Sequence, residues 1–160
     1  MRELVAIDLD KTILKIDSMK LYILLRIYKP KIMKLVLLRF INRYSKKKFH
    51  LEISKLILSE KNYFLEIYFL FLIRFLDLKL LELLNKSFPD GIMVILSNSP
   101  DNVVKRISNH LKFNKGLGLD LSFDFVNSER SLMKLNNLNK FYNKDEYIYK
   151  FFISDNQDDQ

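Results

Sequence analysis

The chain has 160 residues, of which 49% are apolar, and it carries 27 Lys and Arg against 19 Asp and Glu, a net charge of +8. The length fits one domain with room for an insert, and the apolar content is sufficient for a buried core. The absence of cysteine excludes disulfides and thiolate metal sites, and two histidines are too few for a histidine-rich metal site. The basic balance indicates a phosphorylated, nucleic-acid or anionic-lipid partner, or only a codon bias towards Lys, Asn, Ile and Phe.

The first segment of chemical interest is residues 4–14, which consist of LVAIDLDKTIL. Its apolar start predicts a buried strand, because branched side chains suit a sheet that is covered on both faces. Asp8 and Asp10 follow at the carboxyl end of this strand, where open α/β sheets bind ligands. Two carboxylates this close repel each other, so the pair indicates a divalent metal, an acid–base pair, or both. The alternative is an exposed turn with two solvated acids.

The next segment predicts two helices. Asp17 and Ser18 are candidates for a helix N-cap, because their side-chain oxygens can accept from the free N–H groups of the first turn. Apolar residues then dominate from 19 to 28 and, after a proline, from 32 to 44.

Two further helices are predicted before the chain returns to strand-like sequence. Three lysines at 46–48 predict a solvated connector, and residues 51–58 predict a helix. A single long helix is predicted from residue 63 to about 86, with Asn62 as its cap, because apolar residues recur at steps of three and four.

These helical segments do not predict a membrane span. The apolar stretches 21–41 and 63–84 both contain several charged residues, which are costly inside a bilayer. The preferred interpretation is a set of amphipathic helices that pack on one another, and peripheral contact of their basic faces with an anionic membrane is the alternative. The N-terminus lacks the features of a signal peptide, so the expected location is cytoplasmic, with membrane association through the basic faces as the alternative.

A second strand with a polar end is predicted after a Pro-Asp-Gly turn signal. Residues 92–96 are apolar, and the strand ends at Ser97. A helix is then predicted to begin at Ser99 or Asp101 and to run to about residue 111.

The remainder of the chain contains a third strand with a polar end. Residues 113–118, which include two glycines, predict a loop, and residues 119–126 predict a short strand. A helix is predicted over 131–142 and a strand over 147–153. An acidic run at 154–159 follows this last strand.

Together the motifs resemble those of a known family. Three strand-like segments end in an acid pair, a serine and an acidic run, and a parallel sheet would gather these ends along one edge. In this order they resemble the motifs of the haloacid dehalogenase (HAD) superfamily, whose first motif is an apolar run followed by Asp-x-Asp-x-Thr. The resemblance implies an α/β fold with a Rossmann-like parallel sheet (the HAD core) over 1–14 and 89–160. It also implies an inserted helical cap over 15–88, as in the group resembling phosphoserine phosphatase.

The resemblance implies a role for each motif residue. Asp8 would be the nucleophile and a metal ligand, and Asp10 would be the general acid and base, with its backbone carbonyl on Mg²⁺. The hydroxyl of Ser97 would hydrogen-bond a phosphoryl oxygen. Lys134 would balance the negative charge around the nucleophile and the phosphate, with Lys140 as the alternative lysine.

The resemblance also implies the other ligands of substrate and metal. Thr12 and Asn98 would contact the substrate together with Ser97 and Lys134. In the fourth motif, Asp155 and Asp159 would be the metal-binding acids, and Asp158 a neighbour of the second. Two positions depart from the family pattern, because Ser154 and Lys11 stand where the family has, or frequently has, glycine.

The implied activity is Mg²⁺-dependent hydrolysis of a small phosphorylated metabolite through an aspartyl-phosphate. A phosphotransferase would share the aspartyl-phosphate step. The alternatives are a non-catalytic or truncated HAD remnant, because relatives usually continue beyond the fourth motif, and a basic module that binds lipid or nucleic acid. The sequence has no recognised nucleic-acid motif, so no nucleic-acid partner is expected.

Overall fold

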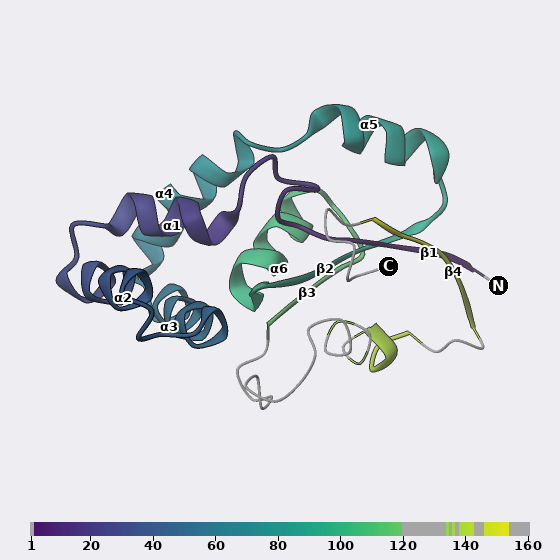
Figure 1. Cartoon of the computed structure of the whole chain (residues 1–160). Helices are drawn as coiled ribbons and strands as arrows, with labels where there is room; N and C mark the ends of the chain where they lie inside the picture. The colour runs from purple at the N-terminus through teal and green to yellow at the C-terminus, as the bar shows by residue number, and fades with distance from the viewer. Residues whose placement is uncertain (1, 120–133, 135, 137, 143–145, 154–160) are drawn as a thin grey trace.

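A computed structural model of the chain describes residues 2–119, 134, 136, 138–142 and 146–153 (Figure 1). The strands and helices, in chain order, are β1 (Arg2–Ile7), α1 (Ser18–Arg26), α2 (Pro30–Phe40), α3 (Lys46–Leu58), α4 (Asn62–Ile73), α5 (Leu78–Ser87), β2 (Ile92–Pro100), α6 (Asp101–His110), β3 (Lys115–Leu119) and β4 (Tyr147–Ile153).

The strands form one parallel sheet in the order β3-β2-β1-β4. The register pairs Ala6 of β1 with Val94 of β2 on one side and with Phe152 of β4 on the other. Because all strands run the same way, their carboxyl ends lie at one edge of the sheet. The prediction of a Rossmann-like α/β sheet is therefore confirmed.

Both faces of the sheet are covered, which explains the continuous apolar runs of its central strands. Val5 and Ile7 pack into the larger apolar cluster, with α6 and the helices between β1 and β2. Leu4 and Ala6 point to the opposite face, against a smaller cluster that includes Leu138. Figure 1 shows α5 and α6 on one side of the sheet and the short helical segment that includes Leu138 on the other.

The helices α1–α4 pack together beyond the carboxyl end of β1 (Figure 1). An aromatic group holds α1 to α4, since the ring of Tyr22 lies edge-on to Tyr68 at 5.8 Å and to Phe64 at 6.1 Å between centroids. Within the described residues, none of the helices combines the length and the apolarity that crossing a bilayer would require.

A buried ion pair also fixes α1. Nη2 of Arg26 lies 2.8 Å from Oε2 of Glu60, while the other carboxylate oxygen accepts from Lys29 at 2.7 Å and from the Tyr22 hydroxyl at 2.8 Å. Burial by itself would raise the pKa of Glu60, but the hydrogen bonds from Lys29 and Tyr22 and the charges of Arg26 and Lys29 outweigh burial and lower that pKa. The carboxylate of Glu60 therefore stays ionised and links Arg26 to Lys29 and Tyr22.

The single helix predicted from 63 to about 86 is wrong, because the structure divides it into α4 and α5. Leu76 forms a bridge with Leu14, and the backbone N–H of Asp77 donates to the carbonyl of Ile13 at 2.8 Å. Asp77 then caps α5, its side chain accepting from the N–H groups of Lys79 and Leu80. The backbone between the helices thus pairs with the segment after β1 instead of continuing the helix.

Two loop predictions are also wrong. The lysines at 46–48 form the first turn of α3, for which Ser45 is the N-cap, although all three side chains are exposed as expected. Residues 115–118, predicted as loop, belong to β3, which pairs with β2. The predicted helix cap at Asn62 is off by one residue, since Lys61 holds that position.

Other sequence predictions are confirmed. Asp17 caps α1, α6 covers the expected segment, and β4 has the predicted bounds, 147–153. Residues 134, 136, 138 and 139 of the helix predicted over 131–142 are helical. The strand predicted over 119–126 lies almost wholly outside the described residues. The division into core and cap remains a prediction, although α1–α5 all lie between β1 and β2 in the chain.

Candidate active site

Asp8 stands at the carboxyl end of β1 and is 8% exposed. Its backbone N–H donates to the carbonyl of Ile153 at 2.8 Å, so the ends of β1 and β4 are held together at this point. One carboxylate oxygen of Asp8 accepts from the N–H of Leu9 at 2.8 Å. The other lies 3.2 Å from Nζ of Lys134, whose side chain is 5% exposed. A buried carboxylate is therefore paired with a buried ammonium group at the edge of the sheet.

Asp10, the second acid of the motif, has different partners. One oxygen accepts from the backbone N–H of Ser18 at 2.6 Å, and the other accepts from the hydroxyl of Ser99 at 2.5 Å. Ser18 is the first residue of α1, so a free N–H group of a helix start binds the carboxylate. Burial raises the pKa of Asp10 to about 6, against the lowering effect of these hydrogen bonds. A carboxyl group with this pKa can both give and accept a proton near neutral pH.

The serine of the second motif lies within the neighbouring strand, because β2 continues to Pro100 and does not end at Ser97 as predicted. Ile7 pairs with Ile95, so Asp8 and Ser97 lie one and two residues past this pair on adjacent segments. Ser97 is 5% exposed, and its hydroxyl accepts from the N–H of Ser99 at 3.2 Å. The topology thus brings the first two motifs to one edge of the sheet.

Sequence reasoning missed the contribution of Ser99, which it considered only as one of two possible helix starts; α6 begins at the other, Asp101. The N-cap position of α6 is Pro100, and the Ser99 hydroxyl instead contacts Asp10 and lies 2.9 Å from the hydroxyl of Ser18. The spacing of the two serines contained the signal, because positions two apart in an extended strand face the same side.

The turn after β1 positions the remaining residues of the first motif. Lys11 has a φ of 58°, in the left-handed region that glycine adopts without a Cβ penalty. This conformation is the physical reason why glycine suits this position. The hydroxyl of Thr12 is buried and has no hydrogen-bond partner among the described residues. Asn98, which follows Ser97 in β2, is partly exposed.

Oxygen donors at this edge fit Mg²⁺, which prefers carboxylate and carbonyl ligands. The carboxylate of Asp8, whose oxygens contact the N–H of Leu9 and Nζ of Lys134, is a candidate for one such ligand. Both oxygens of Asp10 are bound by Ser18 and Ser99, which leaves its backbone carbonyl as the donor that the family resemblance implies. In the described part of the chain, no three His, Asp or Glu side chains are grouped as a metal site. The acids predicted to complete it, Asp155 and Asp159, lie outside the described residues, as do Asp158 and Ser154.

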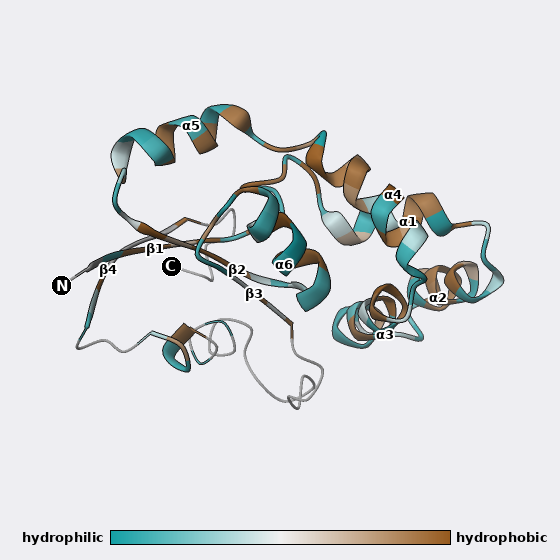
Figure 2. Cartoon of the chain, turned by 180° about the vertical axis from the view of Figure 1, so that it is seen from behind, coloured by the Kyte–Doolittle hydropathy of each residue, from teal (hydrophilic) through white to brown (hydrophobic). Residues whose placement is uncertain are grey.

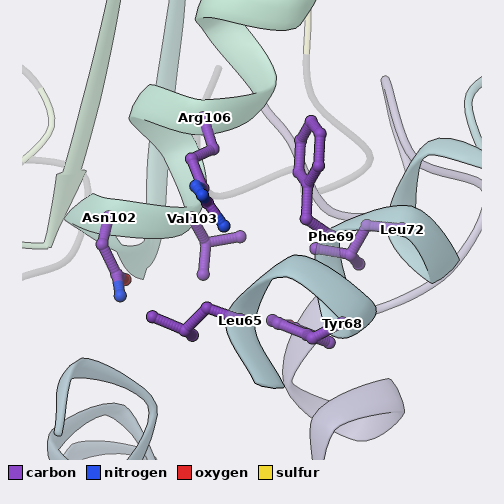
Figure 3. A pocket seen from close by; sticks show the side chains of 7 residues that line it. All are labelled: Leu65, Tyr68, Phe69, Leu72, Asn102, Val103 and Arg106. Carbon is purple, nitrogen blue, oxygen red and sulfur yellow. The ribbon is translucent and has the colours of Figure 1, made fainter. Parts of the chain in front are cut away.

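Two cavities lie away from this edge. One, between α4 and α6, measures about 10 Å³, room for about one water. Figure 3 shows the side chains of Leu65 and Val103 facing each other across it, with Arg106 at its rim. The other measures about 320 Å³ and lies among α1–α4, where Arg26 and Glu60 line it. The small cavity is a packing gap, and only the larger one has the size of a ligand site.

Comparisons with known proteins identify the fold. No family model matches the sequence, and no curated protein matches it. A solved protein of unknown function from Bordetella pertussis Tohama I aligns with 95% of this chain and 81% of its own, with a TM-score of 0.67 and 12% identity. A HAD family hydrolase from Salmonella enterica serovar Typhi aligns with 72% of this chain and 40% of its own, with a TM-score of 0.54 and 12% identity. The resemblance inferred from the motifs is thus confirmed at the level of the fold.

Proposed function

We propose that this chain, which has the α/β fold of a HAD family hydrolase, hydrolyses phosphomonoesters of a small metabolite with the help of Mg²⁺. The observation that carries the proposal is the pairing of buried Asp8 with Lys134. Asp10 follows Asp8 by two residues, and its pKa is raised to about 6. A nucleophile, a countercharge and a proton donor are thereby available within one sheet edge.

The first step would transfer the phosphoryl group to Asp8. A carboxylate oxygen of Asp8 attacks phosphorus, and the bond from phosphorus to the ester oxygen breaks. Asp10, protonated below its pKa, gives its proton to the leaving oxygen, which departs as an alcohol. Lys134 and the hydroxyl of Ser97 would bind the phosphoryl oxygens, a role supported by their burial and by the contact of Lys134 with Asp8.

The second step would regenerate the enzyme. Asp10, now ionised, accepts a proton from a water molecule, whose oxygen attacks phosphorus. The bond between phosphorus and Asp8 breaks, and inorganic phosphate leaves. The carboxyl group of Asp10 therefore donates a proton in the first step and accepts one in the second. A pKa near the working pH favours both transfers.

Mg²⁺ would supply positive charge that draws the substrate phosphate towards Asp8. Asp8 and the carbonyl of Asp10 would hold it, together with Asp155 and Asp159, which follow β4 in the sequence. The carbonyl of Ile153, two positions before Asp155, already contacts Asp8.

The helices α1–α4 would serve as the cap over this site. They follow β1 directly, and α1 reaches the site itself, because its first residue, Ser18, binds Asp10. A cover of this kind would exclude bulk water from the aspartyl-phosphate and choose the metabolite.

The test is release of phosphate from a generic aryl phosphate and a panel of phosphorylated metabolites, with Mg²⁺ or with EDTA. We expect turnover with Mg²⁺, none with EDTA, and loss of at least a thousandfold in Asp8→Asn, because the nucleophile is gone. Asp90→Asn, an exposed acid in the turn before β2, is the matched control and should keep full activity. Circular dichroism establishes that each variant is folded.

The variant Asp10→Asn tests for the aspartyl-phosphate intermediate. It lacks the base of the second step, so radiolabelled phosphate from an activated aryl ester should accumulate on the protein in a hydroxylamine-labile form. Activity that persists in Asp8→Asn contradicts the proposed nucleophile. A folded chain without turnover of any phosphomonoester supports the non-catalytic alternative, and transfer of phosphate to an added alcohol identifies a phosphotransferase.

A further inference from the structure

The basic charge of the chain is concentrated in one segment. Residues 18–51, which span α1, α2 and the first turn of α3, contain ten of the 27 Lys and Arg and none of the 19 Asp and Glu. The remaining 17 basic residues are slightly outnumbered by the 19 acids. The net charge of +8 is therefore a property of this segment and not of the whole surface.

The placement of three of these lysines does not serve helix stability. Lys46, Lys47 and Lys48 lie in the first turn of α3, where the helix dipole favours negative charge. All three are exposed, and of these only Lys48 has a recorded side-chain contact among the described residues, with its Nζ 4.5 Å from the centroid of the Tyr44 ring. Positive charge held in an unfavourable position indicates a partner that neutralises it.

The outer face of α2 is apolar. Its inner face buries Ile32 and Leu35, yet Met33, Leu37 and Phe40 on the other side are 56%, 57% and 84% exposed. These three residues recur at steps of four and three, so they form one stripe along the helix, which we call the α2 stripe. Figure 2 shows α2 among the hydrophobic parts of the cartoon, at the end of the molecule away from β4. Lys34 lies beside the stripe and is also exposed.

We propose that α2, with the basic residues around it, docks on an anionic lipid bilayer. The α2 stripe would enter the boundary between headgroups and acyl chains, and the lysines would contact the headgroup phosphates, as in helices that lie in the membrane plane. The cavity of about 320 Å³ among α1–α4 adjoins α2 through Lys31 and Ile32, and Lys61 also lines it. Because Arg26 and Lys29 in this cavity are already paired with Glu60, Lys31 and Lys61 are the cations that would face a headgroup phosphate there.

Charge complementarity selects the bilayer among the partners of an apolar face. A second copy of the chain would bring two copies of the segment 18–51, which has no acids, together, and their like charges would repel. A nucleic acid would neutralise the lysines but would leave Leu37 and Phe40 without an apolar partner. An anionic bilayer provides both negative charge and an apolar interior.

The test is flotation of the full chain with vesicles of phosphatidylcholine alone or mixed with phosphatidylserine, in about 0.1 M salt. We expect at least tenfold tighter binding to the anionic vesicles. Leu37→Ser with Phe40→Ser should weaken that binding at least tenfold, because both side chains leave the stripe. The matched control is Leu78→Ser with Leu83→Ser on α5, two leucines that are 69% and 60% exposed and should not affect binding.

Charge and insertion are tested separately. Changing Lys46, Lys47 and Lys48 to Gln should weaken binding roughly a hundredfold, at about fivefold for each charge near the bilayer. Since the chain has no tryptophan, Phe40→Trp provides a single fluorophore whose emission should shift to the blue on anionic vesicles. Leu83→Trp is the control and should not shift.

Equal binding to both vesicle types, or equal loss in the α5 control pair, overturns the proposal. A concentration-dependent dimer that the Leu37/Phe40 pair abolishes, without vesicle binding, would assign the stripe to a second copy instead. Binding to duplex DNA without binding to vesicles would assign the lysines to nucleic acid and would equally overturn it. These measurements do not depend on turnover, so a chain without phosphatase activity can still satisfy them.

Discussion

Asp8 and Asp10 are two residues apart and have opposite environments. Asp8 lies 3.2 Å from a cation, whereas both oxygens of Asp10 accept hydrogen bonds from neutral donors, and burial raises its pKa to about 6. Burial favours a protonated carboxyl group at Asp10, whereas the ammonium group of Lys134 gives Asp8 a countercharge. The division of roles that we propose for the two acids follows from this difference.

Lys134→Ala should lower kcat/KM about a hundredfold, because it removes a charged partner of Asp8 and of the substrate phosphate. The matched variant is Lys140→Ala, an exposed lysine that sequence analysis left as the alternative, and it should keep its activity. Steady-state kinetics of both variants measure kcat/KM and so identify the lysine that acts. Full activity in the first and loss in the second would assign the role to Lys140.

Ser99→Ala should shift a pH profile. The proposed first step needs protonated Asp10, so kcat/KM is highest below about pH 6 and falls as the pH rises through the pKa of that residue. The Ser99 hydroxyl lowers this pKa by binding the carboxylate, so its removal raises the pKa and moves the fall in kcat/KM to higher pH.

Ser54→Ala is the control for this profile. Ser54 is buried, and its hydroxyl has no partner within the described residues, so the profile should stay unchanged. An unmoved profile in Ser99→Ala would show that this serine does not tune Asp10.

At the scale of elements, β3 and α6 approach each other more closely than side chains allow. A Cβ at Gly118 would lie 2.4 Å from Cα of Asp101, and one at Gly116 would lie 2.7 Å from the carbonyl oxygen of Val104. These glycines therefore permit contact between a strand and a helix. In the sequence they predicted a loop, because glycine is equally typical of turns.

Gly118→Ala should accordingly lower the free energy of unfolding by about 3 kcal/mol, because backbone atoms must move to admit the methyl group. Thermal unfolding followed by circular dichroism measures the change, about 6–12 °C in Tm for a chain of this size. Asn109→Ala, an exposed change on α6, should alter Tm by no more than a degree or two. An unchanged Tm in Gly118→Ala would contradict the close approach.

At the scale of the whole molecule, the site joins segments from both ends of the chain. β1 supplies Asp8, the helical residue Lys134 pairs with it, and β4 contacts it through Ile153. A ligand that binds where these segments meet should therefore raise the free energy of unfolding of the whole chain.

Mg²⁺ at a hundredfold excess over its Kd should add about 2.7 kcal/mol of stability. This corresponds to a rise of about 5–10 °C in Tm, which EDTA should reverse. Asp8→Asn should not respond to Mg²⁺, because it lacks the ligand that joins the segments. An equal rise in Asp8→Asn would show that the metal binds elsewhere.

The sequence by itself determined where three of the four described strands lie along the chain. Apolar runs of the length of a strand, ended by polar residues, identified β1, β2 and β4, because burial on both faces leaves a local pattern. It also indicated α6 and the N-cap of α1 at Asp17, since caps depend on neighbouring residues. It did not determine whether Lys134 or Lys140 lies beside Asp8.

Only the tertiary structure decided features that depend on contacts between distant residues. The break between α4 and α5 follows from the pairing of Leu76 with Leu14, and one of the two partners of Asp10 is Ser99, 89 positions away. The glycines of β3 belong to a strand because α6 packs against them. Periodicity describes one segment at a time, whereas these outcomes depend on which segments the fold places together.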